Sequence, residues 1–85
     1  MSQPIPEKTK NFVYWRDDWK CRHCGRRDML DPHHVIFRSQ GGTNKCNNLL
    51  ALCRPCHDDI HNGRLEVTIV EVQQYDLTVK FWRIP

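Results

Sequence analysis

The chain has 85 residues, which bounds it to one domain, and its net charge of +3 is too mild to indicate a partner by itself. The mean hydropathy is −0.71, and no apolar run approaches the roughly 20 residues that a membrane helix requires, so a membrane-spanning protein is excluded. The N-terminal residues contain no apolar core and no small-residue cleavage site, and we therefore expect a cytoplasmic protein.

The first elements are a tail and a short helix. Residues 1–9 contain two prolines and polar neighbours with nothing to bury, which predicts a flexible N-terminal tail. From residue 10 to 20, the rings of Phe12, Trp15 and Trp19 recur at the spacing of one helical face. Because bulky rings dominate small cores, we expect these three to pack inside the protein, although contact with DNA is the alternative.

The middle of the chain alternates between short apolar segments and turn residues. Residues 29–37 predict a short strand, and the composition of 39–44 predicts a loop. The apolar run 49–52 is too brief to assign to a helix or a strand. Residues 54–62 predict a helix, with a proline in its first turn and Gly63 as its C-terminal stop.

The last segment, residues 64–85, has the alternation of β-strands. Apolar residues occupy every second position in two runs, which are joined by polar residues at 73–76. The apolar residues of the two runs are Leu65, Val67, Ile69, Leu77, Val79 and Phe81. We expect a β-hairpin that either covers the core or pairs with another copy of the chain. The predicted organisation is thus a tail at 1–9, a core at 10–63 and strands at 64–85 that complete the same domain.

The cysteines predict a metal site. There are five, an odd number that argues against a framework of disulfides, and four of them form two Cys-x-x-Cys pairs. The paired residues are Cys21, Cys24, Cys53 and Cys56, which leaves Cys46 outside the pattern. Four thiolates suit a tetrahedral Zn²⁺, and a site closed by four sulfurs stabilises the fold and does no chemistry. Because so small a core is marginal, we expect metal removal to unfold much of the domain.

The histidines predict a second metal site. His57 and His61 lie four residues apart on the predicted helix, so their imidazoles share one face. His33 and His34 are adjacent on the predicted strand, so they point to opposite sides, and one of them can bind a metal while the other stays free. The fifth histidine, His23, lies inside the first cysteine pair and is either an exposed turn residue or an indirect neighbour of the zinc.

The order of these residues resembles the HNH endonuclease motif in its four-cysteine form. The resemblance is carried by residues 33–39, the two glycines at 41–42 and the run 48–61, and the segment 16–25 also looks like the one that precedes the motif in this family. It covers about residues 12–63. Phe37 stands where family members often have a proline, and the C-terminal alternating segment lies outside the motif.

The resemblance implies an α+β fold, namely a small ββα-metal (His-Me finger) core stapled by the four-cysteine zinc site, with an N-terminal helix and a C-terminal β-hairpin. It also implies roles for five residues. His34 is the general base. His33, His57 and His61 hold one catalytic divalent ion, and Asn48 is the central asparagine, which in some relatives ties down the loop of the base and in others touches the metal.

The implied reaction is hydrolysis of DNA phosphodiester bonds with weak sequence specificity. A neutral His34 takes a proton from the attacking water, and the ion neutralises charge on the phosphorane. Arg38 and Arg54 are candidates to hold the phosphate, with a structural surface role as the alternative for each. Three imidazoles suit Zn²⁺, Ni²⁺ or Mn²⁺, whereas Mg²⁺ prefers oxygen ligands, so the identity of the catalytic ion stays open.

Two other functions are compatible with the sequence. A non-catalytic, zinc-stapled module that binds DNA or protein would need the four cysteines but not the histidines and Asn48. Cleavage of RNA would use the same backbone chemistry. The resemblance is compatible with a bacterial or phage-encoded protein, with phage or restriction partner proteins and with a homodimer formed through the C-terminal strands.

Overall fold

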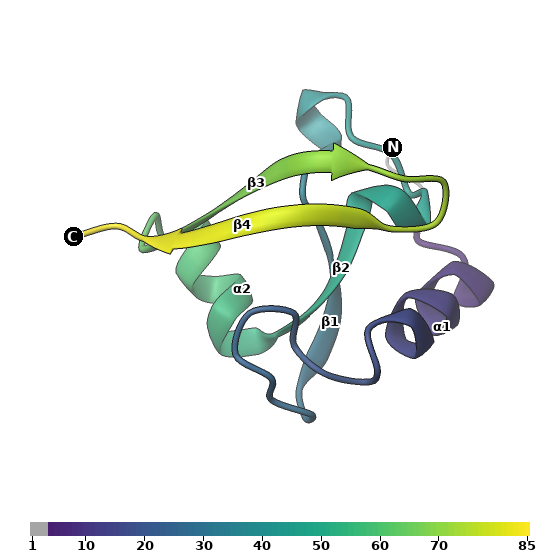
Figure 1. The fold of residues 1–85 in the computed structure, drawn as a ribbon, viewed down its shortest axis with the longest axis horizontal. Helices are drawn as coiled ribbons and strands as arrows, with labels where there is room; N and C mark the ends of the chain where they lie inside the picture. Colours follow the sequence, from purple (N-terminus) through teal and green to yellow (C-terminus); the bar gives the residue numbers. More distant parts are fainter. Residues whose placement is uncertain (1–3) are drawn as a thin grey trace.

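The computed structural model describes residues 4–85. The elements, in chain order, are α1 (Glu7–Arg16), β1 (Leu30–His34), η1 (Arg38–Gln40), η2 (Cys46–Asn48), β2 (Leu49–Cys53), α2 (Arg54–His61), β3 (Leu65–Val72) and β4 (Leu77–Arg83) (Figure 1). The fold is therefore of the small α+β kind. Among the described residues there is no helix of the length and apolar character needed to cross a membrane.

The centre of the fold is the antiparallel pair of β1 and β2, in which His33 lies opposite Leu50. All five residues of β2 are buried. The apolar run that was too short to assign from the sequence is therefore the central strand of the core. α2 follows β2 without a linker, since β2 ends at Cys53 and α2 begins at Arg54. The histidines of β1 are in this way brought beside those of α2.

The N-terminal helix differs from its prediction. α1 begins at Glu7, so residues 7–9 belong to the helix and not to the tail, while the tail predicted for residues 1–3 lies outside the described residues. The prediction that the aromatic rings pack inside is wrong for two of the three, because Trp15 is 69% and Trp19 51% exposed, whereas Phe12 is half-buried.

The two tryptophans are exposed for different reasons. Trp15 lies inside α1 but nearly opposite the buried Val13, so its ring faces away from the core. Trp19 lies beyond the end of the helix. Asp18 and Trp19 have positive φ angles, of 59° and 54°, so the chain leaves the helical path after Arg16 and the expected third ring position never forms. Val13 is instead the fully buried residue of α1, where it packs with Leu49 and Ala51 of β2.

The C-terminal segment forms the hairpin that its alternation predicts. β3 and β4 pair antiparallel, with Val67 opposite Phe81, and residues 73–76 make the turn. Leu65 and Leu77 are buried in one cluster with Leu50 and Leu52 of β2. The hairpin therefore covers the core of its own chain and runs across the β1–β2 pair (Figure 1).

A buried carboxylate ties these parts together. The Asp17 side chain is 1% exposed and accepts hydrogen bonds from Arg16 Nε at 2.8 Å, Arg22 at 2.8 Å and the backbone amide of Ala51 at 2.9 Å. Arg22 also donates to the carbonyl oxygen of Leu77 at 3.0 Å. One carboxylate thus joins the end of α1, the first cysteine turn, β2 and the start of β4.

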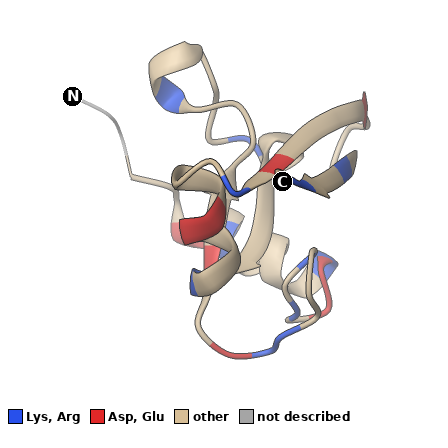
Figure 2. Ribbon diagram, turned by 90° about the vertical axis from the view of Figure 1, so that its left-hand side faces the viewer, with Lys and Arg blue, Asp and Glu red and all other residues tan. Residues whose placement is uncertain are grey.

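The remaining charges are spread over the molecule. Basic and acidic positions are interspersed along the ribbon in the view of Figure 2 and do not separate into two faces. The net charge of +3 therefore does not by itself indicate a nucleic-acid surface.

Replacing Asp17 should destabilise the whole fold. Asp17→Asn keeps the shape of the side chain but removes the buried charge that pairs with Arg16 and Arg22, and leaves these two guanidinium groups only the half-exposed carboxylate of Asp76. We expect a loss of about 3 kcal/mol in the free energy of unfolding, measured by chemical denaturation. The control is Asp18→Asn, because the Asp18 side chain is 74% exposed. A change of less than about 0.5 kcal/mol is expected there, and an equally small change for Asp17→Asn would contradict this account.

Candidate functional site

Four cysteines converge on one point. Cys21 and Cys24 come from the turn after α1, Cys53 ends β2, and Cys56 lies in the first turn of α2. Their sulfurs all lie within 4.8 Å of one another, and the Sγ atoms of Cys24 and Cys53 are 3.5 Å apart. Two sulfurs of a tetrahedral zinc site with bonds of about 2.3 Å are about 3.8 Å apart. The four cysteines are therefore arranged to bind a metal ion.

The protonation of the thiols supports a cation at this point. Burial raises the pKa of Cys53 and of Cys56, and the neighbouring cysteines raise that of Cys56 further. For Cys21, burial also acts to raise the pKa, but hydrogen bonds from backbone amides outweigh it and lower the pKa to about 7. Four sulfurs so close together do not all ionise without a positive charge between them, and a divalent cation supplies that charge.

His23 lies against this cluster. Its Nδ1 is 3.3 Å from the Sγ of Cys56, and its ring packs on Phe81 with a centroid distance of 4.9 Å. Of the two predictions for His23, the structure matches the indirect neighbour of the metal site, because the side chain contacts a cysteine and is not fully exposed.

Three histidines form a second cluster. His33 comes from β1, and His57 and His61 come from α2, with one ring nitrogen of each within 4.8 Å of those of the others. The Nδ1 atoms of His33 and His57 are 3.1 Å apart. Two nitrogens bound to one tetrahedral ion with bonds of about 2.05 Å are about 3.3 Å apart, so the observed spacing fits two ligands of one cation.

Burial keeps the ring of His33 in its neutral form. His33 is 1% exposed, and its Nε2 has no hydrogen-bond partner within residues 4–85. Burial, together with the nearby His57 and His61, lowers the pKa of His33 to about 3, and burial and His61 also lower that of His57. Both rings are therefore neutral at pH 7, which is the form that binds metals. The donor set fits a divalent ion.

His34, the neighbour of His33 on β1, is not one of the three clustered histidines. Its Nε2 lies 2.7 Å from the Oδ1 of Asn44. The histidine cluster and His34 nevertheless share one cavity of about 110 Å³. The cavity is lined by Pro32, His33, His34, Phe37, Arg38, His57 and His61.

Asn48 holds the loop that follows β1. It is 6% exposed, its Oδ1 accepts from the Ile36 amide at 2.9 Å, and its Nδ2 donates to the carbonyls of Ile36 at 3.0 Å and Thr43 at 2.9 Å. These are the contacts of a residue that ties down the loop. The loop is tight at Gly42, where an added Cβ would collide with the carbonyl of Ile36.

The two arginines differ in position. Arg38 lines the histidine cavity, and its guanidinium donates to the Oδ1 of Asn44 at 2.9 Å. Arg54 does not line the cavity, and its Nε lies 3.4 Å from the carboxylate of Asp31. Asn44, which the sequence analysis did not select, thus contacts both His34 and Arg38. In the sequence it is one polar residue of a glycine-rich loop, so its composition indicates only a turn.

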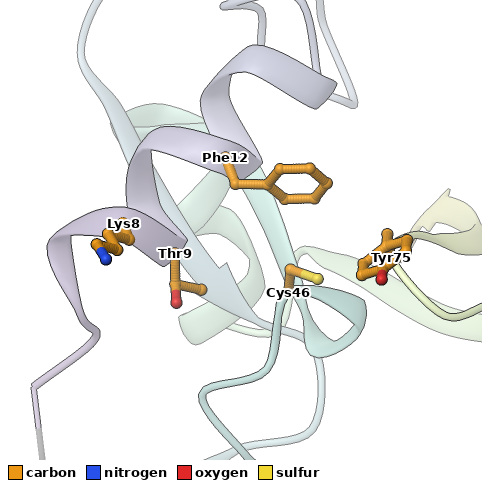
Figure 3. A pocket seen from close by; sticks show the side chains of 5 residues that line it. All are labelled: Lys8, Thr9, Phe12, Cys46 and Tyr75. Carbon is orange, nitrogen blue, oxygen red and sulfur yellow. The ribbon is translucent and has the colours of Figure 1, made fainter.

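A larger cavity lies elsewhere. It has a volume of about 250 Å³ and lies between α1, η2 and the turn of the C-terminal hairpin (Figure 3). Its lining residues are Lys8, Thr9, Phe12, Cys46 and Tyr75. No residue of the histidine or cysteine clusters lines it, so size alone does not identify the functional site here.

Comparisons with known proteins agree with this arrangement. The family model described as HNH endonuclease matches residues 21–63. The chain is 31% identical over 72 residues to the type IV methyl-directed restriction enzyme EcoKMcrA of Escherichia coli (strain K12). That match covers 74% of this chain but only 26% of the relative.

A second relative is close to this chain in length. Anaredoxin of Nostoc sp. (strain PCC 7120) is 32% identical over 73 residues, which cover 81% of this chain and 96% of the relative. No solved structure matches. The segment that the HNH family model matches runs from Cys21, the first cysteine of the cysteine cluster, to Gly63, which follows α2. It includes both clusters. It spans half of the chain and confirms the resemblance seen in the sequence: this chain belongs to the HNH endonuclease family.

Proposed function

We propose that the protein is a metal-dependent endonuclease that hydrolyses the phosphodiester bonds of DNA. The observation that carries the proposal is the single cavity in which three clustered histidines lie beside a fourth that is not part of the cluster. A metal-dependent hydrolase needs ligands for a cation and a separate general base, and a non-catalytic binding module needs neither. Membership of the HNH family supports a nucleic-acid substrate.

In this proposal β1, β2 and α2 form the ββα-metal core. His33 of β1 and both histidines of α2 hold one divalent ion, which when bound polarises the scissile phosphate and neutralises charge on the leaving 3′ oxygen. His34 takes the proton of the water that attacks phosphorus, while the bond from phosphorus to the 3′ oxygen breaks. Asn48 fixes the loop that follows His34, and so acts on the base through the backbone.

The four cysteines hold a structural Zn²⁺ in this proposal. A four-sulfur shell leaves no open position for water, so it takes no part in the reaction. Its role follows from the chain order, because Cys53 and Cys56 flank the junction of β2 and α2. A metal at this junction fixes the direction in which α2 leaves the strand, and thereby the position of His57 and His61.

The substrate is proposed to be DNA with weak sequence preference. Backbone chemistry needs no base contacts, and a chain of 85 residues has little surface with which to read a long site. The name of the Escherichia coli relative states methyl-directed restriction, but this chain corresponds to only 26% of that protein. Selection of methylated DNA is therefore not included in the proposal.

The metal content tests the cysteine site. The purified protein should retain about one Zn²⁺ per chain after weakly bound metal is removed, as measured by mass spectrometry of the elements. Cys53→Ser should lose this ion, whereas Cys46→Ser should keep it, because Cys46 lies outside the cluster. A four-sulfur site also suits iron, so iron in place of zinc would contradict the assignment of the ion.

Chelation provides a second measurement that does not depend on the folding of Cys53→Ser. As a strong chelator withdraws zinc from the wild type, far-ultraviolet circular dichroism should fall in proportion to the zinc released. A zinc-free protein with unchanged ellipticity would show that the cluster does not stabilise the fold.

Cleavage by His34→Ala tests the base. Wild type should nick supercoiled plasmid in the presence of one or more of Mg²⁺, Mn²⁺, Ni²⁺ and Zn²⁺, and His34→Ala should lose at least about 100-fold in rate while binding DNA as before. His57→Ala should also lose cleavage, but with weaker binding of the second metal ion, measured by calorimetry. This difference separates a base from a ligand.

Several outcomes would contradict the proposal. Retained cleavage by His34→Ala removes it as the base. A wild type that binds DNA but cuts neither plasmid nor structured RNA with any of these metals would indicate the non-catalytic module. Cleavage of RNA alone would keep the chemistry and change the substrate.

The two arginines should respond differently to substitution. Arg38 lines the cavity of the histidines, so Arg38→Ala should lower kcat/KM about tenfold or more through loss of a charged hydrogen bond to phosphate. Arg54 lies outside the cavity lining and faces Asp31, so Arg54→Ala should change kcat/KM by no more than about twofold. Equal losses in plasmid nicking would contradict this distinction.

A further inference from the structure

We infer that Asn44 is a positioning residue that fixes the tautomer of His34, so that Nδ1 is the nitrogen that accepts the proton. The inference rests on the proposed function for its catalytic meaning, but not for its geometry. It follows from the hydrogen bonds of one side-chain amide, the Oδ1 of which lies 2.7 Å from His34 Nε2 and 2.9 Å from an amino nitrogen of Arg38.

The partners of the Asn44 amide determine its orientation. The oxygen and nitrogen ends of an asparagine side chain are distinguished by their partners, and a guanidinium group has only donors. The Nδ2 of Asn44 would face a donor if the amide were turned over. Arg38 therefore requires that Oδ1 faces the pair formed by its own guanidinium and His34. The Nδ2 group then points the other way, toward the carbonyl of Pro4 at 3.4 Å.

The Asn44 oxygen in turn determines which nitrogen of the His34 imidazole carries a hydrogen. A carbonyl oxygen only accepts hydrogen bonds, and its two lone pairs are enough for two donors. At 2.7 Å from this oxygen, the Nε2 of His34 must carry a hydrogen. In a neutral imidazole the other nitrogen is then the acceptor, so Nδ1 is left with the lone pair. Arg38 thus determines the orientation of Asn44, and Asn44 determines the tautomer of His34.

The bond between His34 and Asn44 is compatible with the proposed reaction. When Nδ1 takes a proton from water, His34 becomes an imidazolium in which both nitrogens carry hydrogen, and the bond from Nε2 to Asn44 persists. The ring therefore accepts and releases a proton at Nδ1 without turning over. The same oxygen holds the guanidinium of Arg38 beside the cavity, so Asn44 positions both the base and the group proposed to bind phosphate.

Nuclear magnetic resonance measures the tautomer directly. Two-bond proton–nitrogen correlations distinguish the protonated from the unprotonated ring nitrogen, and His34→Ala assigns the signals. In the zinc-loaded wild type, above the titration range of histidine, we expect His34 to be protonated at Nε2. Asn44→Ala should give a mixture of tautomers, and Asn44→Asp should keep the Nε2 form because a carboxylate also accepts from both donors.

The matched control is Asn47→Ala. Asn47 lies three residues further along and donates to the carbonyl of Gln73 at 3.0 Å, away from the histidines. Asn47→Ala should therefore leave the tautomer of His34 unchanged. A His34 protonated at Nδ1 in the wild type, or an equal Nε2 population in Asn44→Ala and wild type, would overturn the inference.

Cleavage links the tautomer to activity. The kcat of plasmid nicking should fall about tenfold or more in Asn44→Ala and recover most of that loss in Asn44→Asp. Recovery of kcat in Asn44→Asp, the carboxylate of which accepts the same hydrogen bonds, distinguishes a positioning role of Asn44 from a general structural role. A wild type that does not cut DNA would contradict the proposed function, while the tautomer measurement would still decide the role of Asn44.

Discussion

The fold depends on one buried carboxylate. Asp17 is almost fully enclosed and satisfies two guanidinium groups together with a backbone amide of the central strand. A buried charge is tolerated only when it is paired and hydrogen-bonded, so the surrounding segments must all be in place at once. Through Arg22 this constraint reaches the C-terminal hairpin, and through Ala51 it reaches β2, which pairs with the strand of His33 and leads directly into α2.

The two clusters share one short stretch of chain. Cys53, Cys56, His57 and His61 occupy the end of β2 and the following helix. Cys56 and His57 are adjacent, so their side chains leave α2 about 100° apart and one helix contributes to both centres. In the proposed function, the four-cysteine site on one side of α2 would stabilise the core and also orient the histidines on the other side, so that one short helix would serve both sites of a small domain.

The sequence predicted the two groups of cysteines and histidines that the structure brings together, and it placed two of the three aromatic residues of the N-terminal helix wrongly. Each Cys-x-x-Cys pair lies within a few residues of the chain, and His57 and His61 lie on one helix. The geometry of a turn or a helix is therefore enough to predict that the members of each pair lie close together. The interpretation failed at Trp19 because positive φ angles follow the end of α1, and at Trp15 because α1 turns the side of Val13 toward β2. It also passed over Asn44, which has no periodic or spacing signal in its loop.

The sequence by itself determined the family, the two sets of metal-binding residue types and the alternating C-terminal hairpin, since these depend on residue identity and on spacing within single elements. The tertiary structure decided what depends on contacts between distant segments. It separated Arg38, which lines the histidine cavity, from Arg54, which faces Asp31. It also brought Asn44 to His34, because a hydrogen bond between a loop and a strand is fixed by the path of the chain in space and not by the pattern of residues along it.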